Sequence, residues 1–444
     1  MRKYLEGYWH IPVFIVAALI AFKLRILNPW NSVFTWTVRL GGNDPWYYYR
    51  LIENCIHNFP YRIWFDPFTH YPYGTYTHFG PFLVYLGSIA GIIFGATSGE
   101  ALRAVLAFIP AIGGILAIFP VYFLTKEVFD KKTAAIAAFI VSFVPGQFLQ
   151  RSLLGFNDHH IWEVFWMVTT LAAYTYALNR WVKSDNWRNK NNLVLSAIAG
   201  LAFGLYLYSW VPGFVLSLVI LMFIYLSIIL KKYLNFNENV VVLTAVMFIV
   251  TALVYLPFAF NTPYFANTKY SPFQLIFLLA VSAVSFILWL LDRNYVKIQK
   301  YLRVPEYQLL IAIAILAVIS VPILTPELYR HIASILRVIQ PKGGSLTVAE
   351  VYPFFFTHAG EFTLSNALYN FGIAFFPAMG AFVYSVYRIY KNRSVTEFAV
   401  LVWAVAMFIA LCGQNRFAYY FGAVVAVYSA LALDFVFSKL HLYS

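Results

Sequence analysis

Thirteen apolar segments of 17 to 24 residues follow one another along this chain, and they constrain its fold more than any other feature. An α-helix needs about 20 mainly apolar residues to cross the hydrocarbon core of a bilayer. Apolar residues make up 61% of the chain and charged residues 11%, whereas soluble domains carry roughly 25% charge. The sequence therefore predicts an all-α polytopic membrane protein. Its apolar segments are 10–27, 79–97, 102–125, 133–149, 160–179, 193–210, 212–230, 239–259, 272–291, 308–324, 366–387, 396–412 and 416–436.

The distribution of charged residues along the chain argues against two classes of protein. The net charge is +13, but the basic residues lie in small groups between apolar segments and form no separate basic domain. We therefore expect no nucleic-acid partner. The middles of the segments are nearly free of charge, whereas ion-coupled transporters place ionisable residues there. That distribution disfavours a transporter.

Basic clusters orient the segments. From the third segment on they follow every second segment, which places them on one face, and the positive-inside rule makes that face cytoplasmic. Arg2 and Lys3 share this face only if an even number of crossings separates them from Lys126. Segment 79–97, which is rich in glycine, is therefore interpreted as an interfacial or re-entrant helix. Twelve crossings remain, and both termini are expected in the cytoplasm of a multi-pass cell-membrane protein.

This topology makes residues 1–444 one transmembrane domain with three notable outer loops. They are the first outer loop (28–101), a short second loop (150–160) and a long flexible loop (325–365). Acidic residues gather in them: Asp44, Asp66, Asp158, Glu350 and Glu361. The cytoplasmic loops are short basic connectors. Chemistry is therefore expected on the extracytoplasmic face.

The first motif of the outer loops runs from Gly41 to Arg50 and contains Asp44 followed by Pro45. Glycines free the backbone here and place a carboxylate at the start of a helix. A purely structural interpretation is also open, with Asp44 as the N-cap and Pro45 as the first helical residue.

The second motif runs from Arg151 to His160 and ends in Asp158-His159-His160. Side chains at positions i and i+2 of an extended segment point to the same side, so Asp158 and His160 can act together. Oxygen and nitrogen donors of this kind suit Mn²⁺, Mg²⁺ or Zn²⁺. A short loop between membrane helices has little structural need for such residues, which favours a metal site.

Two further motifs lie late in the chain. Ser345 to Glu350 follows the hinge Pro341–Gly344 and an expected amphipathic helix at about 326–340. Glu350 is either functional or a solvated loop acid. Arg416 lies at the outer end of the last segment. It can bind a phosphate through two hydrogen bonds, or it can extend to the lipid headgroups.

Taken in order, these motifs resemble the catalytic subunit family of oligosaccharyltransferases, and the archaeal form most closely. The similar segments are Asn43-Asp44 with Tyr47 to Arg50, Phe65-Asp66-Pro67 with Tyr71 to Gly74, Gly155 to His160 with Glu163, Thr347 to Glu350, and Asn415-Arg416. The resemblance covers nearly the whole chain. It implies the type C glycosyltransferase fold, with about twelve transmembrane helices plus interfacial helices in the first outer loop.

The resemblance also implies a reaction and its residues. The family transfers a glycan from a polyprenyl-linked (dolichyl) phosphate or pyrophosphate donor to an acceptor asparagine, with Mn²⁺ or Mg²⁺ as cofactor. By that resemblance the metal ligands are Asp44, Asp158 and His160, and the acceptor amide is bound by Asp44 and Glu350. Catalytic roles fall to Asp44, Asp158, Glu350 and Arg151. The donor phosphates lie near Arg416, His78, His159 and Trp210, with Arg151 beside them.

One departure from the family leaves alternatives open. The family carries a C-terminal outer domain with a Trp-Trp-Asp-Tyr-Gly motif that reads the Ser/Thr of the acceptor, and no Trp-Trp pair occurs in this sequence. We expect a truncated form, a split gene with a separately encoded soluble reader domain, or a divergent transferase. Two competing hypotheses are an O-linked or lipid-directed transferase of the same fold and an inactive membrane subunit.

Overall fold

The computed structural model describes residues 10–324, 326, 329, 330, 333, 349–357 and 359–440. Helices dominate these residues, as the apolar segments predict. Within this part of the chain, one small antiparallel sheet pairs β1 (Phe65–Asp66) with β2 (Thr75–Tyr76).

The helices follow the apolar segments closely. The first half of the chain forms α2 (His10–Phe22), η1 (Lys23–Leu27), α3 (Trp30–Val33), α4 (Asp44–His57), α5 (Pro81–Ile93), α6 (Gly99–Leu116), α7 (Ile118–Val128), α8 (Lys131–Val141), α9 (Gly146–Gln150) and α10 (His160–Trp181). The second half forms α11 (Lys190–Ser209), η2 (Val211–Phe214), α12 (Val215–Ile229), α13 (Asn239–Tyr255), η3 (Leu256–Phe258), α14 (Pro272–Leu302), α15 (Glu306–Leu324), η5 (Ala349–Val351), α17 (Ser365–Phe371), η6 (Gly372–Ala374), α18 (Phe375–Asn392), α19 (Val395–Gly413), η7 (Asn415–Phe417) and α20 (Ala418–Lys439).

Nine helical stretches within the described residues are long and apolar enough to cross a membrane. They correspond to nine of the twelve predicted crossings. The other three are segments 133–149, 160–179 and 308–324. The first divides into the short helices α8 and α9, the second is α10, whose Glu163, Trp and Tyr residues lower its hydropathy, and the third is α15. The mostly helical membrane architecture expected from the sequence is confirmed.

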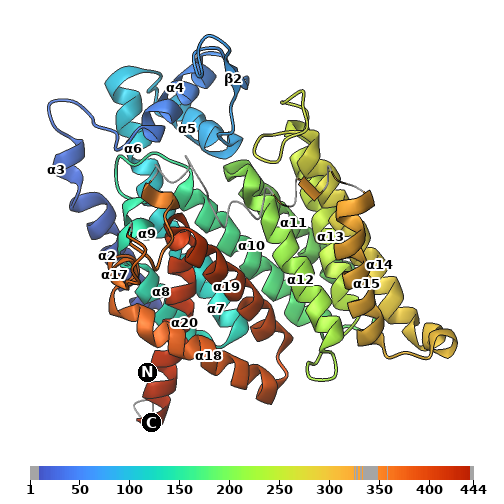
Figure 1. Cartoon of the computed structure of the whole chain (residues 1–444). Helices are drawn as coiled ribbons and strands as arrows, with labels where there is room; N and C mark the ends of the chain where they lie inside the picture. Colours follow the sequence, from blue (N-terminus) through green and yellow to red (C-terminus); the bar gives the residue numbers. More distant parts are fainter. Residues whose placement is uncertain are drawn as a thin grey trace.

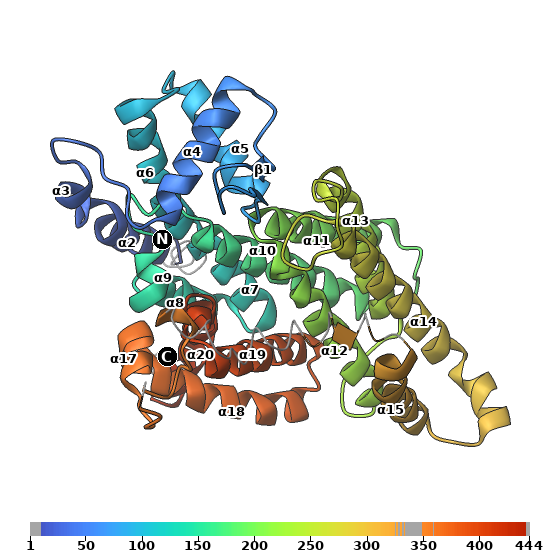
Figure 2. The same ribbon diagram turned by 45° about the horizontal axis from the view of Figure 1, so that its top comes forward.

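Helix α20 lies in the core of the molecule. Its residues 418–431 are buried on every side, because it packs against α8, α18, α9 and α10. Helices α10, α11, α13 and α14 pack against one another in that order and form a row that extends away from α20 (Figures 1 and 2). A helix that is apolar all round is typical of such a buried position.

The first outer loop builds a compact cap at one end of the molecule. Helix α4 packs against α5, and both lie with the small sheet at the end opposite the last turns of α20 (Figure 1). Helix α5 has 13 residues, which at 1.5 Å per residue span about 20 Å, less than the roughly 30 Å of a bilayer core. Its length agrees with the prediction that segment 79–97 does not cross.

A buried arginine holds the second outer loop in place through hydrogen bonds. Arg25 is fully buried in η1, where its Nε donates to Ser152 Oγ at 2.9 Å and its Nη1 donates to the Ser142 carbonyl at 2.6 Å. The Arg25 carbonyl accepts from the Leu154 amide at 2.8 Å. Gly114 makes room for the guanidinium, since a Cβ there would lie 2.4 Å from Arg25 Nε. The hydrogen bonds to the buried Arg25 therefore fix the position of the loop that carries Asp158.

Candidate functional site

The loop between α9 and α10 is joined to the start of α4. Gly155 has a φ of +83°, a conformation that favours glycine, and a Cβ there would lie 3.0 Å from the Arg39 carbonyl. The Gly155 amide donates to the Ala107 carbonyl, and its own carbonyl accepts from the Gly41 amide, each at 2.9 Å. This pairing brings the first two sequence motifs together.

Asp158, His159 and His160 form a cluster at the start of α10. Their potential ligand atoms all lie within 4.8 Å of one another. His160 Nε2 lies 3.2 Å from Asp158 Oδ2. Two atoms bonded to one ion at about 2.1 Å and at right angles are about 3 Å apart. The donor types and their separation therefore fit a single divalent cation.

The charges in this cluster shift the pKa values of Asp158 and His159 in opposite directions. Burial acts to raise the pKa of Asp158, but the charges of His160 and His159 lower it well below its usual range. Burial acts to lower the pKa of His159, yet the charges of Asp158 and Glu163 raise it to about 9. Both ring nitrogens of His159 face these two carboxylates. His159 thus lies between Asp158 and Glu163, whereas His160 faces Asp158 with Nε2 and Glu163 with Nδ1.

Asp44 is the first residue of α4 and lies close to the cluster. The N-cap of this helix is Asn43, so Asp44 is not the N-cap that the structural interpretation of the sequence supposed. Partial removal from water raises the pKa of Asp44, and the negative charge of Asp158 raises it further. A cation bound between the two carboxylates would remove this repulsion.

Glu350 lies between two arginines. One carboxylate oxygen accepts from Arg151 and the other from Arg416. Burial acts to raise the pKa of Glu350, but the charges of Arg151 and Arg416 lower it, so the side chain stays ionised. The Asn415 amide donates to the Tyr352 carbonyl at 2.7 Å and joins η7 to the segment after Glu350.

Parts of the predicted long loop lie outside the described residues. These are residues 345–348 of the third motif, the hinge 341–344, and most of the amphipathic helix predicted at 326–340. Glu350 itself is described, in η5.

Phe79 connects the other predicted phosphate-binding residues to the cluster. Its backbone forms an isolated bridge with Trp210, at the end of α11. Its ring centroid lies 4.5 Å from that of His78 and 5.8 Å from that of His159. The Trp210 and Tyr420 ring centroids lie 6.2 Å apart. His78 and Trp210 therefore border the cluster, although neither belongs to it.

Comparison with known proteins identifies the family. The family model described as "Oligosaccharyl transferase STT3, N-terminal" matches residues 15–409. The chain belongs to the STT3 oligosaccharyl transferase family. The resemblance drawn from the sequence motifs is confirmed.

Individual STT3-family proteins are similar to this chain in sequence and in structure over nearly its full length. Dolichyl-phosphooligosaccharide-protein glycotransferase 3 of Archaeoglobus fulgidus is 58% identical over 449 residues, which cover 100% of this chain and 52% of the relative. A solved structure of the oligosaccharyltransferase AglB from the same organism, in complex with an inhibitory peptide and a dolichol-phosphate, superposes with a TM-score of 0.94 at 58% identity. It covers 99% of this chain and 52% of that one.

A crystal structure of the Archaeoglobus fulgidus oligosaccharyltransferase in complex with Zn and sulfate matches with a TM-score of 0.83 at 53% identity. It covers 97% of this chain and 50% of that one. The chain spans about half the length of the STT3-family relatives that it matches. The expected type C glycosyltransferase fold is borne out over this half.

Sequence reasoning assigned no role to several side chains of this STT3-family site. Glu163 is fully buried behind the two histidines, and the Tyr419 and Tyr420 hydroxyls both donate to it. A signal was present, because Glu163 follows His159 and His160 by four and three residues, which places all three on one helix face. The tyrosines gave no comparable signal, since their contact with Glu163 joins helices that are distant in the chain.

Asp66, which the acidic composition of the first loop singled out, fixes that loop internally. Its buried carboxylate accepts from Arg50 Nη2 at 2.9 Å, Tyr47 Oη at 2.9 Å, Thr69 Oγ1 at 2.8 Å and the Phe68 amide at 3.0 Å. Every oxygen of Asp66 is thereby occupied. The contacts indicate that it shapes the cap over the site.

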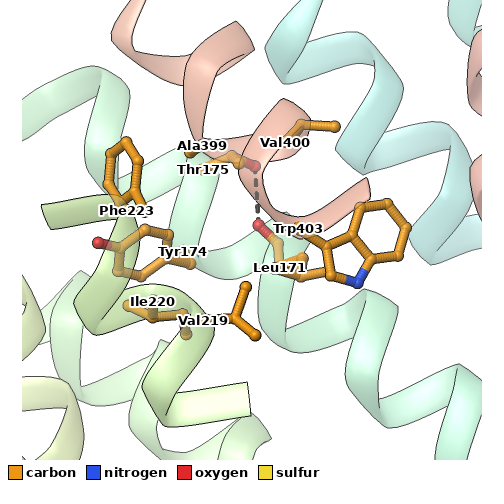
Figure 3. Close-up of a pocket in the computed structure, with 9 residues that line it drawn as sticks. All are labelled: Leu171, Tyr174, Thr175, Val219, Ile220, Phe223, Ala399, Val400 and Trp403. Atoms are coloured by element: carbon orange, nitrogen blue, oxygen red, sulfur yellow. Dashed lines mark hydrogen bonds between the residues drawn. The ribbon is translucent and has the colours of Figure 1, made fainter. Parts of the chain in front are cut away.

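A small apolar cavity lies elsewhere, between α10, α12 and α19. Leu171, Phe223 and Trp403 are among the side chains around it (Figure 3). Thr175 points its hydroxyl back to the Leu171 carbonyl at 2.9 Å and so offers no free polar group. This cavity is a packing gap of the STT3-family core and lacks the chemistry of the outer site.

Proposed function

We propose that this chain supplies the membrane-embedded part of an oligosaccharyltransferase. It transfers an oligosaccharide from a polyprenyl (dolichyl) phosphate or pyrophosphate donor to an asparagine of an acceptor polypeptide. The observation that carries the proposal is the convergence of Asp44, the Asp158–His160 cluster and the Arg151–Glu350–Arg416 triplet. Relatives named as glycotransferases, and solved with a peptide, a dolichol-phosphate or Zn and sulfate, support the same reaction.

Asp44, Asp158 and His160 hold the metal in this proposal. When bound, a divalent ion such as Mn²⁺ or Mg²⁺ stabilises the negative charge that develops on the leaving phosphate. Arg151, Arg416 and the His159 cation supply further positive charge to the same phosphate, with His78 and Trp210 at its edge. Fixed charges in a water-poor site stabilise a developing anion strongly.

The acceptor amide requires activation, because its nitrogen lone pair is conjugated with the carbonyl. Asp44 and Glu350 can each accept one N–H of the amide and so favour a rotated, less conjugated nitrogen. That nitrogen forms a bond to the sugar carbon as the bond from this carbon to the phosphate oxygen breaks. The amide proton passes to a carboxylate and the electron pair leaves with the phosphate.

The active face and a further partner are also part of the proposal. The basic connectors lie at the opposite ends of the spans from the first outer loop, which supports an extracytoplasmic site. The relatives are about twice as long as this chain. We therefore place the group that reads the acceptor hydroxyl outside these 444 residues, either on a further domain or on a separate polypeptide.

A chimera tests the reaction. The chain is fused to the remaining half of the Archaeoglobus fulgidus relative and placed in membranes with Mn²⁺, a polyprenyl-linked donor and an Asn-x-Thr peptide. We expect glycopeptide that disappears with chelator or with Asp158→Ala and persists with Tyr174→Phe, which removes a buried hydroxyl far from the cluster. Activity that survives both chelation and Asp158→Ala would refute the proposal. Product on a hydroxyl or on lipid would support an O-linked or lipid-directed enzyme instead.

A further inference from the structure

Glu163 is a fully buried carboxylate in the first turn of α10, and four polar side chains surround it. Burying a carboxylate costs free energy unless other groups compensate its charge and hydrogen-bonding capacity. The fold provides this compensation from two separate helices, α10 and α20. A residue that requires so much support indicates a role beyond packing.

The two oxygens of Glu163 face different partners. Oε1 lies 3.0 Å from His159 Nε2 and 3.1 Å from His160 Nδ1. Oε2 accepts from the Tyr419 hydroxyl at 3.0 Å and from the Tyr420 hydroxyl. An ionised carboxylate only accepts hydrogen bonds, so a ring nitrogen that bonds to it directly, with no cation between them, carries a proton.

With the proposed cation between Asp158 and His160 Nε2, this constraint selects one tautomer of His160, because only Nδ1 then bonds to a carboxylate directly. With its proton on Nδ1, the neutral ring keeps its lone pair on Nε2, the atom that lies 3.2 Å from Asp158 Oδ2. In the other tautomer Nε2 would carry the proton and could bind no metal. Histidine ligands in metal sites are commonly oriented by a carboxylate on the second nitrogen.

We propose that Glu163 is a positioning residue that fixes the tautomer and the ring orientation of His160 for metal binding, and that Tyr419 and Tyr420 hold Glu163 in place. This inference rests on the metal site proposed above. It also connects that site to the phosphate-binding residues. The Tyr419 ring lies 4.9 Å from the His160 ring and 5.1 Å from the Arg151 guanidinium carbon.

Mn²⁺ binding to the full chain in detergent micelles tests the role of Glu163, measured by calorimetry and by pulsed electron paramagnetic resonance. Glu163→Gln keeps the shape of the side chain but removes its negative charge. We expect the Mn²⁺ affinity of this variant to be about 10- to 100-fold lower. The coupling of Mn²⁺ to an imidazole nitrogen should weaken or vanish in this variant. A simple structural defect would not remove that nitrogen signal while Mn²⁺ stayed bound.

Three further variants separate the outcomes. The double change Tyr419→Phe with Tyr420→Phe leaves the carboxylate in place and should lower the affinity less than Glu163→Gln; it also serves as the test if Glu163→Gln does not fold. Tyr174→Phe removes a buried hydroxyl of α10, the helix that carries Glu163. This hydroxyl bonds to Thr244 at 2.9 Å, and its loss should change neither the Mn²⁺ affinity nor the nitrogen signal. If Asp158→Asn abolishes binding while Glu163→Gln and the double variant retain full affinity and the nitrogen signal, this inference is wrong and the metal site stands. If Asp158→Asn also binds normally, the proposed function itself fails.

Discussion

At the scale of single residues, Glu350 has the most informative position. It would bind the acceptor, yet it pairs with Arg151 and Arg416, which would bind the donor phosphate. A carboxylate and a phosphate both match the two-pronged geometry of arginine. Glu350 therefore occupies the place that an anionic donor group would take.

The first prediction follows from this competition. Glu350→Gln removes the internal anion and should strengthen the binding of inorganic phosphate by about tenfold, which corresponds to about 1.4 kcal/mol. Calorimetric titration of the purified chain measures this. Glu361→Gln is the matched control, because it removes an exposed carboxylate that follows Glu350 in the same loop. Equal phosphate affinity in the two variants would show that Glu350 does not compete with phosphate.

Asp66 carries the second prediction. Burial acts to raise its pKa, but hydrogen bonds from Arg50, the Phe68 amide, Thr69 and Tyr47 lower it to about 2. Because the folded pKa lies below the unfolded value of about 3.9, Asp66 stabilises the fold above pH 4, and this contribution is lost as the pH falls towards 2. Asp66→Asn should therefore cost about 2 kcal/mol at pH 7, the usual value for a hydrogen-bonded charge.

Thermal unfolding in detergent at several pH values checks this. The difference in Tm between the native chain and Asp66→Asn should stay constant from pH 7 to pH 5 and shrink below pH 4. A difference that is unchanged at pH 3, or absent at pH 7, would count against a stabilising role of the ionised carboxylate.

At the scale of elements, the short helix α5 decides the topology of the first loop. The third prediction is that a cysteine introduced at Ser98, just after α5, reacts with an impermeant label added from outside. Cys55 and Cys412 are replaced first, and a cysteine at Lys232, in a predicted cytoplasmic connector, is the control that should label only from inside. Labelling of position 98 only from the cytoplasm would mean that segment 79–97 crosses.

The helices show where sequence patterns succeed and where they stop. Segment 193–210 predicted α11 (Lys190–Ser209) to within three residues at its start and one at its end, because hydropathy and helix length nearly coincide there. Helix α14 continues eleven residues beyond the predicted end at 291, through Asp292 and Arg293. A hydropathy pattern detects the apolar part of a helix and ends at the first charges, although the backbone hydrogen bonds continue.

At the scale of the whole molecule, the sequence allowed the individual site residues to be predicted, but not which of them contact one another. Asp158 and His160 lie two residues apart, so local geometry predicted their proximity. The ion pairs of Glu350 join residues separated by 199 and 66 positions, and only the packing of η5, η7 and the end of α9 brings them together. The two tyrosines that bond Glu163 were beyond prediction for the same reason.

The fourth prediction concerns acceptor choice by the chain as a whole. A site built to bond a hydroxyl can reject analogues that lack it by about 10⁴-fold. Glu350 is a candidate contact for the asparagine, whereas the sequence offered no candidate contact for the acceptor hydroxyl. The 444 residues alone should therefore transfer glycan to Asn-x-Thr peptide poorly and discriminate little against Asn-x-Ala. Robust, threonine-dependent transfer by these residues alone would place the hydroxyl contact within them.

The metal site is the central claim, and Mn²⁺ binding to the purified chain tests it most directly. We predict one Mn²⁺ per chain in equilibrium titrations. Binding should be abolished by Asp158→Ala and by His160→Ala, weakened by Asp44→Ala and unaffected by Glu361→Gln. Binding that is unchanged in both Asp158→Ala and His160→Ala would contradict the account.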